Sequence, residues 1–148
     1  MKILIQLQLL FLFIAPLRSQ QIFEEYTKLN GNLRYGTGKN DVMPFGDRGY
    51  TLILPDKSIA THGSIIMLDD QKINLYDTSD TQHIHINREA NARGFAVLYV
   101  STGIPVDLYF SETSLIYVDT LLKRIFHQYH LPDRNIFLLG SWYPDTEL

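Results

Sequence analysis

Runs of apolar residues, each as long as a β-strand, punctuate the chain after its first third. They cover residues 50–54, 63–68, 95–100 and 135–140. Continuous apolar runs of this length are typical of strands buried on both faces, as in a parallel sheet that is covered by helices. Pro55 ends the first run, because proline cannot donate a hydrogen bond to a neighbouring strand.

Helical patterns occupy two of the segments between these strands. Residues 87–93 are good helix formers, and Gly94 follows them as a common helix end. Ser111 can cap a longer helix over residues 112–129, before Pro132 forbids its continuation. In the longer helix an apolar stripe recurs at steps of three and four residues: Leu115, Val118, Leu122, Ile125 and Tyr129. The alternation of strand and helix predicts crossover connections in a parallel sheet.

The first 19 residues have the pattern of a targeting segment. Lys2 precedes a mostly apolar run over residues 3–17, which is shorter than the roughly 20 residues of a membrane-spanning helix. Small and polar residues follow it, so we expect a secretory signal peptide over residues 1–19 that is cleaved near Ser19. An uncleaved membrane anchor is the alternative. The expected location is therefore secreted or periplasmic, without a stable membrane anchor after cleavage.

Composition narrows the class of protein further. The length of 148 residues suggests one domain, and 45% apolar with 20% charged residues is far from a disordered composition. A formal charge of −3 argues against a nucleic-acid binder, which normally has a basic face. The absence of cysteine excludes disulfides, a thiolate nucleophile and a cysteine-type zinc site. No cofactor is expected. Residues 20–47 are polar and predict an irregular lead-in, with a weak first strand near residues 33–35.

One stretch of the sequence resembles a known family. Residues 118–122 and residues 129–140, which read Tyr-His-Leu-Pro-Asp-Arg-Asn-Ile-Phe-Leu-Leu-Gly, are similar to secreted α/β-hydrolases of the esterase, feruloyl-esterase or depolymerase kind. In these enzymes a helix, a Pro-Asp-Arg turn and an apolar strand lead into the nucleophile elbow Gly-x-Ser-x-Gly. The resemblance extends from Tyr50 to Gly140. It implies an α/β protein with a partial α/β-hydrolase fold over residues 48–148, built as a mostly parallel sheet in three layers.

The elbow itself departs from the family pattern. Gly140 aligns with its first glycine, so Trp142 stands at the nucleophile position and Pro144 at the second glycine. Ser141 comes one residue early, and a shift of one residue after a strand turns a side chain to the opposite face. Ser141 is therefore the one candidate nucleophile, and we expect an ordinary serine there.

The catalytic triad of this family also lacks its later members. The chain order is Ser, then Asp or Glu, then His. The histidines all precede the elbow: His62, His83, His85, His127 and His130. The resemblance thus implies the N-terminal fragment of a secreted carboxylic ester hydrolase, truncated at the elbow and inactive alone. A non-catalytic secreted binding or accessory protein on the same half-fold is the alternative.

Two further sets of side chains could carry chemistry. By resemblance, Asp69 and Asp70 belong to the loop that helps build the oxyanion hole, and paired carboxylates also occur in glycosidases. Adjacent residues at a strand end usually face opposite ways, so a solvated strand end is the simpler interpretation. His83 and His85 would share one face of an extended segment, a spacing that metal ligands use.

A metal site at these histidines would lack half of its ligands. The metallo-β-lactamase pattern continues with an acid and a third histidine, but Asn87 and Arg88 stand there. We therefore expect two exposed loop histidines, and a small metal-dependent hydrolase remains a third hypothesis.

The last apolar run predicts a surface that contacts other chains. Residues 135–140 carry no charge and have strong β propensity. The family's next helix and strand are not present after this run, so we expect one open edge and self-association through it.

Overall fold

The computed structural model describes residues 20–34, 42–69, 72–77, 81–104 and 112–140. The strands and helices in chain order are β1 (Gln21–Lys28), β2 (Asn32–Arg34), β3 (Val42–Pro44), β4 (Asp47–Leu54), β5 (Gly63–Asp69), α2 (Thr81–Ala92), β6 (Phe95–Ser101), α3 (Glu112–Gln128) and β7 (Ile136–Gly140). The four strands expected from apolar runs are all present as β4, β5, β6 and β7. The signal-peptide prediction over residues 1–19 lies outside the described residues.

The main sheet has five strands in the order β1-β4-β6-β5-β7. β4 pairs antiparallel with both β1 and β6, whereas β5 pairs parallel with β6 and β7. A second, two-stranded sheet pairs β2 with β3, also antiparallel. Most of these pairings are therefore antiparallel, and strands dominate over the two described helices.

The expected fold class, a partial α/β-hydrolase fold with a mostly parallel sheet, is wrong. The mixed sheet overturns it, because β4 runs against both of its neighbours. The reason lies in the pattern from which the expectation came. A continuous apolar run reports burial on both faces, and a central antiparallel strand that is covered on both faces gives the same run. Strand direction is not encoded in it.

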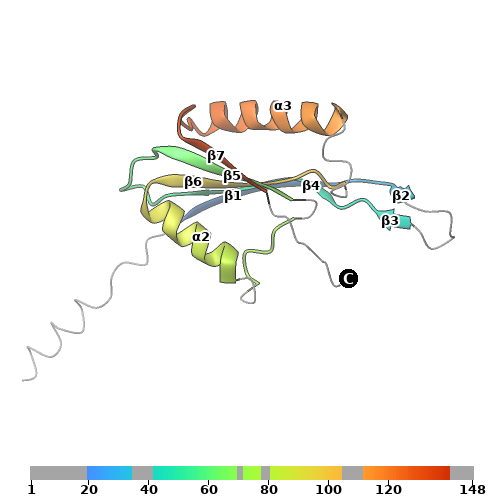
Figure 1. Ribbon diagram of the computed structural model, residues 1–148, viewed down its shortest axis with the longest axis horizontal. Coiled ribbons are helices and arrows are strands. Elements are labelled where there is room, and N and C mark those ends of the chain that lie inside the picture. Colours follow the sequence, from blue (N-terminus) through green and yellow to red (C-terminus); the bar gives the residue numbers. More distant parts are fainter. Residues whose placement is uncertain (1–19, 35–41, 70–71, 78–80, 105–111, 141–148) are drawn as a thin grey trace, which may run out of the picture.

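Helices cover both faces of the main sheet, α3 on one face and α2 on the other (Figure 1). The core under α3 includes Leu52, Leu98 and Ile125, and the core under α2 includes Val97 and Tyr99. Leu98 and Val97 are neighbours in β6, so their side chains point to opposite faces of the sheet. This alternation makes β6 the buried centre of the molecule.

Both helices differ in detail from the sequence pattern. α2 begins at Thr81, six residues before the expected start, and ends at Ala92, shortly before the expected stop at Gly94, whose φ of 77° lies in the left-handed region. In α3 the buried stripe includes Leu121, which the pattern missed, whereas Leu115 is exposed. The packed face is therefore rotated slightly from the predicted one.

The segment expected to be an irregular lead-in contains three strands. No side chain of β1 is fully buried, and the half-buried Gln21, Phe23 and Tyr26 stand among exposed residues, as in an edge strand with a solvated face. Its full length pairs with β4, from Gln21 opposite Leu54 to Lys28 opposite Asp47. The polar residues of β1 therefore belong to the edge of the sheet, although without strict alternation they resemble an irregular segment.

β7 forms the opposite edge of the sheet and is open. Among the described strands it pairs with β5 alone. Phe137 is 53% exposed and Leu138 is 64% exposed, so neither face of this strand is fully covered. The expectation of an open apolar edge at this strand is confirmed.

Candidate functional site

The ends of β5 and β6 form the polar edge of the main sheet. β5 ends at Asp69, which lies in register with Ser101 at the end of β6. β4 runs the opposite way, so it begins at this edge with Asp47. The chain leaves β5 toward α2 on one face and β6 toward α3 on the other (Figure 1). Sheets that contain parallel strands bind ligands at such a reversal.

Short hydrogen bonds tie the three strand ends together. The Thr102 amide donates to the Asp69 carbonyl oxygen at 3.2 Å. The Ser101 hydroxyl donates to the Asp47 carbonyl oxygen at 2.6 Å. The Arg48 Nε–H donates to the Thr102 carbonyl oxygen at 3.0 Å. These hydrogen bonds satisfy carbonyl oxygens at the strand ends and hold the three strand ends in fixed positions relative to one another.

Arg48 also contacts an aromatic ring from α3. Its guanidinium carbon lies 4.6 Å from the centroid of the Tyr117 ring, which is a cation–π distance. Burial raises the pKa of the Tyr117 phenol, although the charge of Arg48 opposes this shift. Arg48 therefore presents a fixed cation at the edge, held between the Thr102 backbone and the α3 ring.

A second polar network lies on neighbouring β1 and β4. The Tyr26 hydroxyl and the Thr51 hydroxyl are 2.9 Å apart, and Thr51 donates to Glu24 at 3.1 Å. Lys72 Nζ donates to the other Glu24 oxygen at 3.2 Å and lies 4.7 Å from the Tyr26 ring centroid. Because Thr51 donates its only proton to Glu24, Tyr26 is the donor to Thr51.

Tyr26 is consequently a neutral donor at physiological pH. Burial raises the pKa of its phenol to about 12, and the carboxylates of Glu24 and Asp69 raise it further against the Thr51 hydrogen bond. The edge thus has a fixed guanidinium on the face that α3 covers, and a neutral phenol with a carboxylate on the opposite face, which Thr51 shares with Ile53. Such groups can bind and orient a polar ligand. The described residues place no nucleophile and base together here.

The residues named from the esterase resemblance meet at this edge in part. Asp69 is half-buried at the end of β5, while Asp70 and Ser141 lie outside the described residues. Leu68 in β5 stands opposite Gly140 in β7. The strand that resembles the oxyanion side and the strand that resembles the approach to the elbow therefore end side by side.

His83 and His85 do not share a face. The expected extended segment is instead part of α2, where residues two apart point in very different directions. The His83 ring packs against the Tyr99 ring at 5.4 Å, while His85 Nδ1 lies 3.1 Å from an Arg88 nitrogen. Over the described ranges no three His, Asp or Glu side chains gather as metal ligands do.

Sequence reasoning missed Arg48, Tyr26 and Tyr117. They come from β4, β1 and α3, and none of them belongs to a motif. The sequence of β1 has no strict alternation of apolar and polar residues, so it carried no clear local signal that placed Tyr26 on a strand.

Comparison with protein-family models, with curated proteins and with solved structures finds no match to this chain. The comparisons therefore support no family assignment. Within the part of the chain that the structure describes, neither helix combines the length and apolarity needed to cross a membrane.

Proposed function

We propose that this chain is an exported, esterase-like polypeptide that supplies one side of an ester-hydrolysis site and is inactive alone. The observation that carries the proposal is the parallel pairing of β5 with β7, which sets Leu68 opposite Gly140. The mostly parallel hydrolase sheet is not part of this proposal. The residues at the polar edge and the resemblance of the sequence within residues 118–140 to secreted esterases support the proposed activity.

The pairing matters because of what an ester hydrolase needs. Its oxyanion hole takes one backbone N–H from the turn after the nucleophile strand and a second from the loop after a neighbouring strand. In this chain the ends of β7 and β5 are such neighbours. Both strands end at the same side of the sheet, and β6 separates them from β4, which carries the fixed cation of Arg48.

The described histidines do not supply the general base. His62 precedes β5, and His127 and His130 precede β7. These three histidines therefore lie near the starts of the parallel strands, away from the strand ends that form the polar edge. His83 and His85 belong to α2, where they contact Tyr99 and Arg88. The proposal therefore assigns the general base and its acidic partner to a polypeptide segment other than the residues described here.

The test starts from the coding DNA that follows the codon of Leu148. One reading frame there should encode Gly-x-Ser-x-Gly and then an acid and a histidine. A chain extended in that frame should hydrolyse p-nitrophenyl acetate and lose the activity when the elbow serine becomes alanine. The 148-residue chain and its Ser141→Ala variant should both match the buffer rate. A missing frame, or hydrolysis by the unextended chain that depends on Ser141, would refute the proposal.

Export is proposed on the same footing as the activity. It rests on Lys2, the apolar run over residues 3–17 and the polar residues after it. N-terminal sequencing of protein recovered outside the cytoplasm should begin near Gln20. A mature N-terminus at Met1 in a purely cytosolic product would contradict it.

A non-catalytic binding or accessory role is the second candidate function. The open apolar edge of β7 favours it, because such an edge recruits further strands. We propose self-association through this strand and no nucleic-acid partner. The second candidate would gain support if the downstream frame were absent while the chain still formed defined oligomers.

A further inference from the structure

A groove runs between α2 and β7 on one face of the sheet. Its volume is about 670 Å³, and it is open to solvent. Its floor is apolar and comes from β5, α2, β6 and β7: Ile65, Ile86, Phe95, Phe137 and Leu139. Phe95 and Phe137 stack edge to face with their ring centroids 5.8 Å apart, so the floor is already ordered.

The width of the groove matches one helix. α2 packs on β6, and β7 lies two strands away in the order β6-β5-β7. Two strand spacings amount to about 9.6 Å, and packed helices lie about 8–10 Å apart. A helix that docks beside α2 would therefore cover β5 and β7 without displacing α2 or any strand of the sheet.

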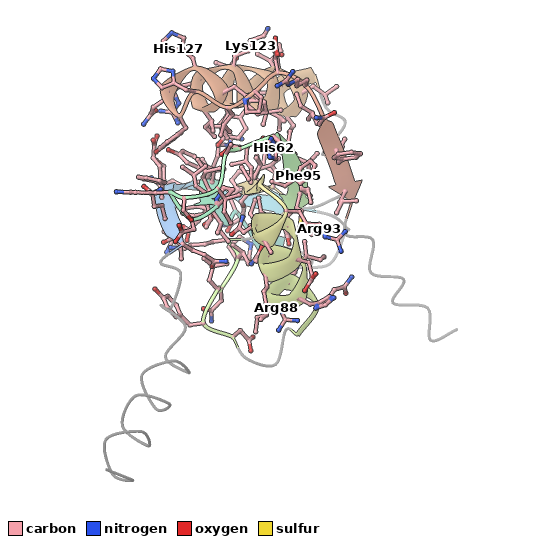
Figure 2. The ribbon with its side chains drawn as sticks, turned by 90° about the vertical axis from the view of Figure 1, so that its left-hand side faces the viewer. His62, Arg88, Arg93, Phe95, Lys123 and His127 are labelled. Carbon is pink, nitrogen blue, oxygen red and sulfur yellow. The ribbon has the colours of Figure 1, made fainter. Side chains whose placement is uncertain are left out.

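Charge on the rim selects among possible helices. Glu89 and His85 of α2 line the groove together with Arg93, which follows the helix. Arg88 does not line it but contacts both Glu89 and His85. Both guanidiniums share the single Glu89 carboxylate, at 3.5 Å from Arg88 and 3.8 Å from Arg93. Figure 2 shows Arg93 and Phe95 on the side of α2 that faces β7. With Arg88 and Arg93 against the single carboxylate of Glu89, the rim has a net positive charge above an apolar floor.

We propose that this groove binds an amphipathic helix of a partner polypeptide, with large apolar residues on one face and acidic residues along its flank. The apolar face would cover Phe137 and Leu139, and the acids would pair with Arg93 and Arg88. This inference does not rest on the ester-hydrolase proposal, since it uses neither the polar edge nor Ser141.

The opposite edge of the sheet offers no equivalent surface. β1 carries Glu24, Glu25 and Lys28, and charged side chains of this kind protect an edge from other chains. Glu24 and Glu25 are also engaged, by Lys72 at 3.2 Å and by Arg124 at 2.9 Å. The β1 edge is charged and its acids are paired, whereas the β7 side is apolar, so we place the docking surface on the β7 side.

The probe is a fluorescent peptide of about 15 residues, long enough to form a helix, with Leu at every third or fourth position and Glu along one flank. A matched peptide carries Lys in place of Glu. Fluorescence anisotropy with the full chain should show saturable binding of the Glu peptide, at least tenfold tighter than that of the Lys peptide. Equal binding of both peptides, or no saturable binding, would overturn the proposal.

Two matched pairs of variants locate the site. Arg93→Glu should weaken binding of the Glu peptide about tenfold, whereas Lys123→Glu on the other face (Figure 2) should not; both side chains are 75% exposed. Phe137→Ser should abolish binding, whereas Leu138→Ser should preserve it, because Leu138 does not line the groove. Circular dichroism confirms folding, and Leu139→Ser replaces any variant that unfolds.

Equal loss in Phe137→Ser and Leu138→Ser would instead show pairing along the β7 backbone. That result, or dimers of the chain that exclude the peptide, would mean that a strand or a second copy covers this side, and the helix proposal would fail. The esterase assay above would be unaffected by either result.

Discussion

The hydroxyl groups of Tyr50 and Tyr129 lie 3.0 Å apart and join strand β4 to the turn that follows α3. The two residues are 79 positions apart in the chain, and their rings also meet edge to face at 6.4 Å. Phe23 of β1 completes the cluster, with its ring centroid 4.8 Å from that of Tyr129. Three elements are thus held by one group of aromatic side chains.

The hydroxyl pair should contribute measurably to stability. Tyr129→Phe leaves the Tyr50 hydroxyl without this partner, so the free energy of unfolding should fall by about 1 kcal/mol. Urea denaturation measures it, and Tyr50→Phe combined with Tyr129→Phe should cost less than the sum of the single changes. Tyr76→Phe, at an exposed ring, is the control and should change nothing. Additive losses would mean that the two hydroxyls act independently.

The chain should lose stability at alkaline pH. The folded pKa of Tyr26 is raised from 10.0 to about 12, mainly by burial, so the folded state keeps a proton that the unfolded state releases. The stabilisation is complete below pH 10 and is lost as the pH rises toward 12. Denaturant titrations across this range should show a smaller fall for Tyr26→Phe than for the wild type. Tyr50 also has a raised pKa, so some fall remains in the variant. Identical slopes would contradict the burial of the Tyr26 phenol.

Two isoleucines of α3 should respond very differently to truncation. Ile125 is 0% exposed and Ile116 is 59% exposed. Ile125→Ala should cost about 2–5 kcal/mol, because it removes buried methyl groups and leaves a cavity. Ile116→Ala should change the free energy of unfolding by no more than about 0.5 kcal/mol. Similar losses at both positions would show that α3 packs through a different face.

Gly94 should not tolerate a side chain. Its φ is 77°, and an added Cβ would lie 2.6 Å from the Ala60 carbonyl oxygen and 2.7 Å from the His62 ring. Gly94→Ala should therefore cost about 1–3 kcal/mol, through backbone strain together with these contacts. Thermal unfolding followed by circular dichroism measures the loss. Ala92→Ser, at an exposed position of the same helix end, should be neutral.

Charges on β7 should reduce self-association without unfolding the chain. The double change Phe137→Lys with Leu139→Lys places charges at side chains that are already exposed, so sedimentation velocity at high concentration should show less oligomer. Val97→Lys, in the buried centre of β6, should instead unfold the protein. Unchanged oligomers in the double variant would mean that the chains meet elsewhere.

Local features of this protein were settled by the sequence itself. Three features each depend on neighbouring residues: the apolar runs that became β4 to β7, the end of α2 shortly before Gly94, and the charge-free strand over residues 136–140. Burial of a strand, the backbone freedom of glycine and the lack of charge are properties of short segments, so they can be read from the order of residues.

Only the tertiary structure decided how these segments meet. The antiparallel placement of β4 beside β6, the start of α2 at Thr81 and the meeting of Arg48 with Tyr117 depend on contacts between distant segments. Residues 81–86 adopt a helix because packing, which includes His83 against Tyr99, outweighs a weak local preference. The direction of a buried strand and the partners of a side chain are set by the lowest free energy of the whole sheet, and no single segment carries that information.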